Sequence, residues 1–121
     1  MLLNWRVGIK TYGSTQAVAN VVKTQPLFYA QVSIILMNRK QQRILDAVFT
    51  TPTKANIKFS DIEKLLVSLG AIKVEGDGSR VSFELNERQT FAHRPHPNKE
   101  AKKYQVEAFR EFLRLAGVTD E

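Results

Sequence analysis

The spacing of hydrophobic residues along this chain changes from a helical period to a strand period and then back. Between residues 38 and 69, apolar side chains recur about every 3.6 residues, as they do on one face of an α-helix. Residues 71–93 instead alternate with a period of about two, which is typical of a half-buried β-strand. The helical spacing returns from residue 102. This order predicts an α+β domain in which helices cover one face of an antiparallel sheet.

Two helices are expected before the strands. The first is predicted to begin after Asn38, because asparagine is a good N-cap residue. The second is predicted near residues 60–69, where Ser60 and Glu63 have the spacing of a capping box and Gly70 follows as a left-handed cap. Its apolar stripe consists of Ile62, Leu65, Leu66 and Leu69.

Three strands are expected next, as an antiparallel meander. The first is predicted over residues 71–75 and the second over 79–85, with the glycine-rich turn 76–78 between them. The third is predicted from Gln89 to about His93, ahead of two prolines that cannot donate to a strand ladder. One face of the sheet, which we expect to be solvated or to bind a ligand, carries Arg80, Ser82 and Glu84.

A last helix is predicted over about residues 102–116 and is expected to end at Gly117. The expected order of elements is therefore α-α-β-β-β-α, within a domain of residues 37–121. Residues 1–36 contain no acidic residue and show no clear period. We leave open whether they form a dispensable extension, an element that packs on the domain, an interaction arm or a transit peptide.

Composition excludes several kinds of site. The chain has no cysteine, which excludes disulfides, thiolate–zinc sites, iron–sulfur ligation and cysteine catalysis. Its 18 Lys and Arg residues exceed its 12 Asp and Glu residues, and the net charge of +6 favours an anionic partner. The longest weakly polar run, residues 27–37, is shorter than the roughly 20 apolar residues that span a bilayer. We therefore expect a cytoplasmic protein that makes no membrane contact.

Cationic side chains and both histidines gather after the third predicted strand. Such a cluster favours a polyanion, because each neutralised phosphate releases counterions. The Gly-Asp-Gly turn before the second strand could also approach a phosphate through its backbone N–H groups, although a hairpin turn explains it equally well. The residues predicted to hold phosphate are Gly78, Ser79, Arg80, Arg94, Lys99, Lys102 and Lys103.

Three interpretations of His93 and His96 remain open. As metal ligands they lack a third partner, since Glu100 is the only nearby carboxylate, and we expect neither a metal nor another cofactor. They could be ordinary structural residues of a proline-rich turn. They could also contact nucleic acid or transfer protons, since histidine exchanges protons near neutral pH.

Five short segments carry a resemblance to a known family: 61–66, 69–71, the Gly78-Ser79 turn, His96-Pro97 with the lysines after it, and 112–118. Together they resemble the HicA toxins, the RNA-cleaving partners of HicB antitoxins. The resemblance covers about residues 40–118. It implies a fold like that of double-stranded-RNA-binding domains, mRNA cleavage without a metal, and a HicB-type antitoxin as partner.

One position departs from the usual family pattern, in which a histidine follows the Gly-Ser turn. Here Arg80 follows it, and the sequence looks like a longer subgroup with Gly-Ser-Arg-Val. An arginine cannot act as a base at neutral pH, but it can hold a phosphate. The proton of the ribose 2′-OH is then expected to go to His96 or His93, which makes Arg80, His93 and His96 the candidate catalytic residues. We prefer His96, because His93 ends a strand and is expected to be half-buried.

The alternatives to an RNA-cleaving toxin are a non-catalytic RNA-binding module and a protein-interaction domain. We leave open the oligomeric state and the RNA sequence preference.

Overall fold

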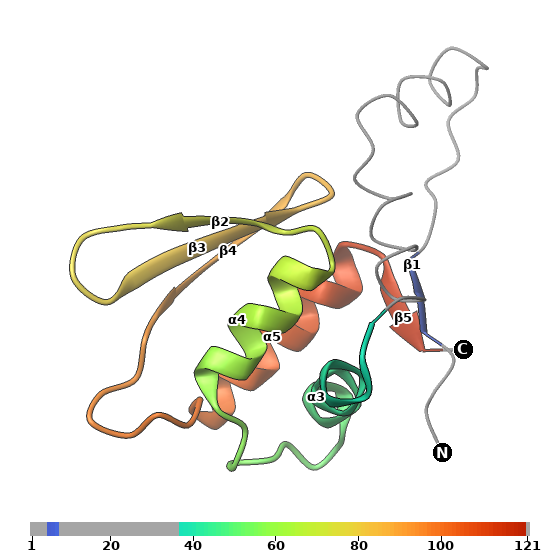
Figure 1. The fold of residues 1–121 in the computed structure, drawn as a ribbon, viewed down its shortest axis with the longest axis horizontal. Coiled ribbons are helices and arrows are strands. Elements are labelled where there is room, and N and C mark those ends of the chain that lie inside the picture. The colour runs from blue at the N-terminus through green and yellow to red at the C-terminus, as the bar shows by residue number, and fades with distance from the viewer. Residues whose placement is uncertain (1–4, 8–36, 121) are drawn as a thin grey trace.

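A computed structural model describes residues 5–7 and 37–120 of the chain. Helices α4 and α5 lie side by side against one face of a three-stranded sheet, and α3 packs beside them (Figure 1). The described residues form the helices α3 (Arg39–Phe49), α4 (Phe59–Ser68) and α5 (Lys103–Leu115), and the strands β1 (Trp5–Val7), β2 (Ile72–Glu75), β3 (Arg80–Leu85), β4 (Arg88–His93) and β5 (Val118–Asp120).

The main sheet has the strand order β2-β3-β4 and is antiparallel throughout. Together with the three helices it confirms the predicted α+β fold and the order α-α-β-β-β-α. Strands β3 and β4 are joined by a turn at Asn86 and Glu87, which both have a positive φ, of 55° and 68°. Such two-residue turns match the right-handed twist of a hairpin and set its register.

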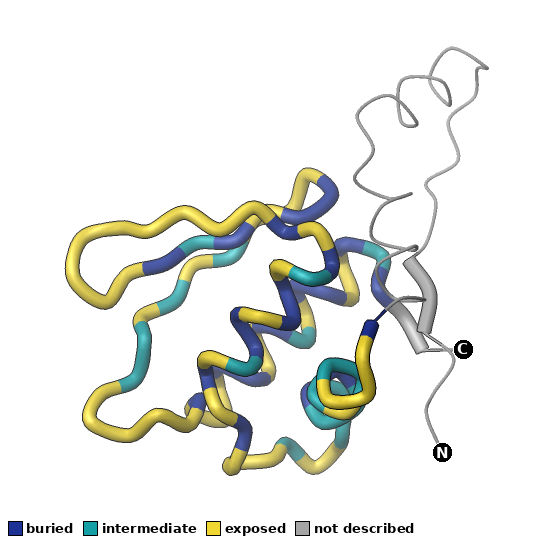
Figure 2. The backbone as a smooth tube through the Cα atoms, in the orientation of Figure 1, coloured by how far each residue is buried: buried dark blue, intermediate teal, exposed yellow. Residues whose placement is uncertain are grey.

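The hydrophobic core lies between the sheet and the helices. Val81, Phe83 and Leu85 of β3 are buried there, as their alternation predicted. Phe83 packs edge-to-face on Phe109 of α5, with ring centroids 6.0 Å apart. On the other side of the sheet the side chains are largely exposed, and β2 is exposed along its whole length (Figure 2).

The predicted helix ends are confirmed in part. The Asn38 side chain accepts a hydrogen bond from the backbone N–H of Gln41 at 2.8 Å, and Gly70 has a φ of +98°. The predicted capping box of Ser60 and Glu63 is wrong, because α4 begins at Phe59 and its N-cap residue makes no side-chain cap. Glu63 is buried instead, and its carboxylate accepts hydrogen bonds from a distant arginine.

A second, two-stranded sheet was not predicted. Its strands β1 and β5 pair antiparallel, with Arg6 opposite Thr119. The remainder of the predicted 1–36 extension, residues 1–4 and 8–36, lies outside the described residues. None of the described helices has the length and hydrophobicity needed to cross a bilayer.

Candidate functional site

The open face of the sheet brings Arg80 and His93 side by side. The two residues are directly opposite each other in the β3–β4 ladder, and both are exposed. Residues opposite each other in an antiparallel pair project to the same face, with Cβ atoms about 5 Å apart. The structure therefore confirms that the face with Arg80 is solvent-accessible, and it adds an imidazole to that face.

A hollow of about 380 Å³ lies on this face, at the end of the sheet where β2 turns into β3. A guanidinium, an imidazole, a hydroxyl and an aromatic ring thus share one open surface. The hollow is lined by Gly76, Arg80, Val81, Ser82, Phe91, Ala92 and His93.

Gly76 leaves room for the Arg80 side chain. A Cβ atom at position 76 would lie 3.1 Å from the Cβ of Arg80, which is a tight contact. The backbone N–H of Gly76 also donates to the carbonyl of Arg80 at 2.9 Å, so the turn is held against the start of β3. Gly78, two residues later, has a φ of +62°, as the turn prediction required.

His93 is held from two sides. Its ring Nδ1 lies 3.3 Å from the Ser79 hydroxyl, and its backbone carbonyl accepts a hydrogen bond from the Gln105 side-chain amide at 2.8 Å. The oxygen of the same buried amide accepts from the backbone N–H of Lys102 at 3.0 Å. The expectation that His93 is half-buried is wrong, because the residue is exposed and lines the hollow on the open face.

Arg94, the next residue, has a different environment. Its guanidinium donates to both oxygens of Glu75, at 2.7 and 2.8 Å, and its Nε donates to Glu63 at 3.0 Å. These bonds lower the pKa of the Glu75 carboxyl and raise the pKa of Arg94. Arg94 therefore ties the end of β4 to α4 and β2, and it does not line the hollow.

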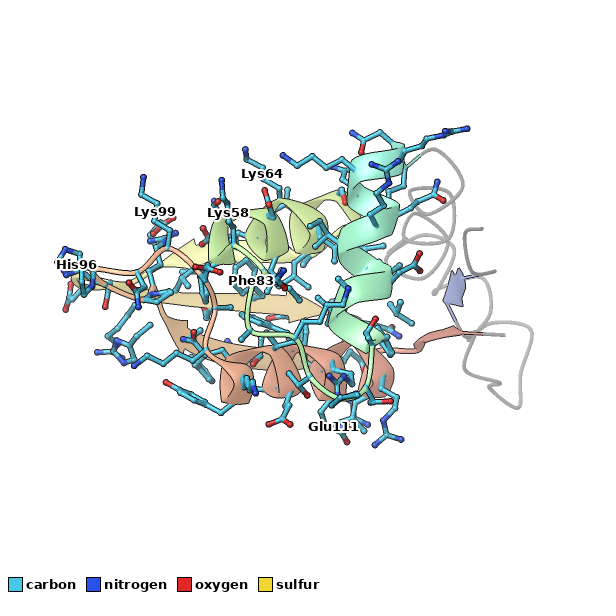
Figure 3. The ribbon with its side chains drawn as sticks, turned by 90° about the horizontal axis from the view of Figure 1, so that it is seen from below. Lys58, Lys64, Phe83, His96, Lys99 and Glu111 are labelled. Atoms are coloured by element: carbon cyan, nitrogen blue, oxygen red, sulfur yellow. The ribbon has the colours of Figure 1, made fainter. Side chains whose placement is uncertain are left out.

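The other predicted site residues of the loop after β4 and of the start of α5 do not line the hollow. His96 is exposed in the loop after β4, at one end of the molecule, and it makes no hydrogen bond or ion pair within the described residues (Figure 3). The Lys99 side chain points to the same side as Lys58 and Lys64 (Figure 3). The exposed residues Lys102 and Lys103 lie at the start of α5. In the part of the chain that is described, no three His, Asp or Glu side chains are grouped as metal ligands.

Phe91 was missed by the sequence analysis, although a signal for it exists. The turn at Asn86 and Glu87 makes Leu85 the partner of Arg88, and the same register places Ser82 opposite Phe91. Since Ser82 belongs to the predicted polar face, the register puts Phe91 on that face as well.

A comparison with protein families finds a match for the part of the chain that contains the hollow. A family model described as the HicA toxin of bacterial toxin–antitoxin systems matches residues 59–118, about half of the chain. The chain belongs to the HicA toxin family. The matched region runs from α4 to the start of β5 and includes every residue that lines the hollow.

HicA proteins are the toxins of toxin–antitoxin systems and are known as endoribonucleases, so an antitoxin partner and an RNA substrate follow at the level of the family. A search of curated proteins and a search of solved structures found no match.

Proposed function

We propose that this HicA-family toxin binds mRNA in the hollow of its open sheet face and cleaves it without a metal. The observation that carries the proposal is the placement of Arg80 directly opposite His93, with both side chains exposed. Membership in the HicA family supports the role as a toxin. The roles of individual residues are proposed from their geometry.

Arg80 is proposed to bind the phosphate at which the RNA is cut. Within the described residues the Arg80 guanidinium has no ion-pair partner, whereas Arg94 has two. An arginine in this situation can bind a phosphate through two parallel hydrogen bonds. It can also stabilise the negative charge that develops on the phosphoryl oxygens during the reaction.

His93 is proposed as the general base. When its Nδ1–H donates to the Ser79 hydroxyl, its Nε2 can accept a proton from the ribose 2′-OH. The 2′ oxygen then forms a bond to phosphorus, the bond from phosphorus to the 5′ oxygen breaks, and a solvent proton goes to that oxygen. The products are a 2′,3′-cyclic phosphate and a free 5′-OH. His93 replaces His96 as the preferred base, because it is the histidine that lies opposite Arg80.

Lys99, Lys102 and Lys103, which lie outside the hollow, are proposed to hold the RNA backbone beyond it. The Gly78-Ser79 turn borders Arg80, and Ser79 contacts His93. Lys102 is connected to the His93 end of β4 through Gln105, and Lys103 follows it in α5. His96, Arg94 and Lys99 belong to the loop beyond β4, where the engagement of Arg94 by two carboxylates leaves it a structural role.

The test is cleavage of end-labelled single-stranded RNA by the purified protein in the presence of EDTA. We expect His93→Ala to lower the rate about 10²- to 10⁴-fold, the typical contribution of a general base. His96→Ala is the matched control, since it removes an exposed histidine from the neighbouring loop, and its rate should stay close to wild type. Arg80→Ala should also lose activity, whereas Arg88→Ala, an exposed arginine at the far end of β4, should retain it.

Cleavage that stops in EDTA, or that is unaffected by His93→Ala, would contradict this mechanism. Retardation of the RNA without fragments would reduce the protein to a binding module. When the protein is expressed in cells, we expect growth to stop. The arrest should depend on His93 and should be relieved by a co-expressed HicB-type antitoxin.

A further inference from the structure

A large aromatic side chain, Phe91, lies exposed in the same hollow as the Arg80 guanidinium. Phe91 is 72% exposed and makes no ring contact within the described residues. Its neighbour two residues along β4 is His93, and both line the hollow together with Arg80. The Phe91 ring is accessible to a ligand, and it shares the hollow with the Arg80 guanidinium.

We propose that Phe91 is a stacking platform for one base of single-stranded RNA, next to the phosphate held by Arg80. This inference rests on the proposed function and adds a base-binding residue to it. Every nucleic-acid base has a flat π-face, so an exposed ring can bind any base without reading its sequence. A base in a duplex is already stacked and paired, and the platform therefore selects unpaired RNA.

The position of Phe91 favours RNA over a protein partner. Two more apolar residues, Ile72 and Val74, are exposed on the same face, at 62% and 55%. Neither of them lines the hollow, and Ser82 of β3 lies between Val74 and Phe91. Phe91 is thus the aromatic residue among those that line a hollow with a guanidinium, and an aromatic ring beside a cation is the combination that proteins use for single-stranded nucleic acid.

The experiment measures binding of a short, uncleavable 2′-O-methyl oligonucleotide by fluorescence anisotropy. We expect Phe91→Ala to weaken binding about 5- to 150-fold, the usual range for loss of one stacked base. Phe91→Trp should bind about as tightly as wild type and more tightly than Phe91→Ala, because tryptophan also supplies an aromatic ring. Val74→Ala is the matched control, since it removes an exposed apolar side chain from the same face but outside the hollow.

An abasic oligonucleotide separates stacking from charge. Arg80→Ala should weaken binding of the normal and the abasic strand alike, whereas Phe91→Ala should weaken binding of the normal strand only. Equal binding of the normal strand by wild type and Phe91→Ala would overturn the inference and leave the proposed function intact. Loss of antitoxin binding with unchanged RNA binding would also overturn it and would assign Phe91 to a protein interface. A wild-type protein that binds no single-stranded RNA would overturn the proposed function itself.

Discussion

The two faces of the sheet differ in whether their arginine side chains form ion pairs. His93 and Arg94 are consecutive residues at the end of β4, yet their side chains lie on different sides of the sheet. On the helix-covered side, Arg94 is held by Glu63 and Glu75. On the open side, His93 lies opposite Arg80, which has no ion-pair partner among the described residues. Charge on the covered side stabilises the fold, and charge on the open side is available to a ligand.

The largest expected effect comes from comparing one phenylalanine on each face. Phe83→Ala should lower the free energy of unfolding by about 3–5 kcal/mol, because it leaves a cavity next to Phe109. Phe91→Ala should change it by no more than about 0.5 kcal/mol, because the ring is exposed. Denaturant unfolding of both variants measures the difference. Similar losses in the two variants would mean that Phe91 is a core residue.

The two arginines should differ by a smaller amount. Arg94→Ala leaves the buried carboxylate of Glu63 without its partner, and we expect a loss of about 1–3 kcal/mol in the free energy of unfolding. Arg80→Ala should change this free energy by no more than about 0.5 kcal/mol. The same denaturant titration tests both. A stable Arg94→Ala variant would show that the ion pairs contribute little to the fold.

The smallest expected effect is a pH dependence of the free energy of unfolding that comes from the bond between Glu75 and Arg94. Arg94 lowers the pKa of Glu75 below its usual 4.5, so the folded state binds the proton of this carboxyl more weakly than the unfolded chain does. The resulting stabilisation is present above pH 4.5 and is lost as the pH falls through the lowered pKa. The raised pKa of Arg94 has no effect in the acid range, because arginine is protonated there in both states.

Glu75→Gln should therefore lose less stability than wild type when the pH falls below 4.5. Denaturation midpoints at neutral pH and in acid measure this loss. If wild type and Glu75→Gln lose the same stability in acid, the pH dependence comes from other carboxyl groups.

Most of the fold could be predicted from the sequence, because its signals are local. The alternation of Val81, Phe83 and Leu85 places them on one face without knowledge of any partner strand. The failed capping box at Ser60 and Glu63 shows the limit of such signals. Its spacing is correct, but the carboxylate bonds to Arg94, 31 residues away, and spacing along the chain carries no information about that contact.

The candidate site was predicted only in outline. Arg80 was expected on the polar face, and the basic segment after β4 was recognised. The sequence analysis preferred His96 to His93 and grouped Arg94 with Arg80 as phosphate-binding residues, because it could not show which face of the sheet each side chain occupies. The strand pairing supplies this information, and the same pairing places Phe91 on the open face.

Gln105 connects the start of α5 to the end of β4. The oxygen of its buried amide accepts from the backbone N–H of Lys102, and its nitrogen donates to the carbonyl of His93. One buried side chain therefore joins the first turn of α5 to the backbone that carries the imidazole. If Lys102 and Lys103 bind the RNA as proposed, the strand that they hold is fixed relative to the residue that is to take its proton.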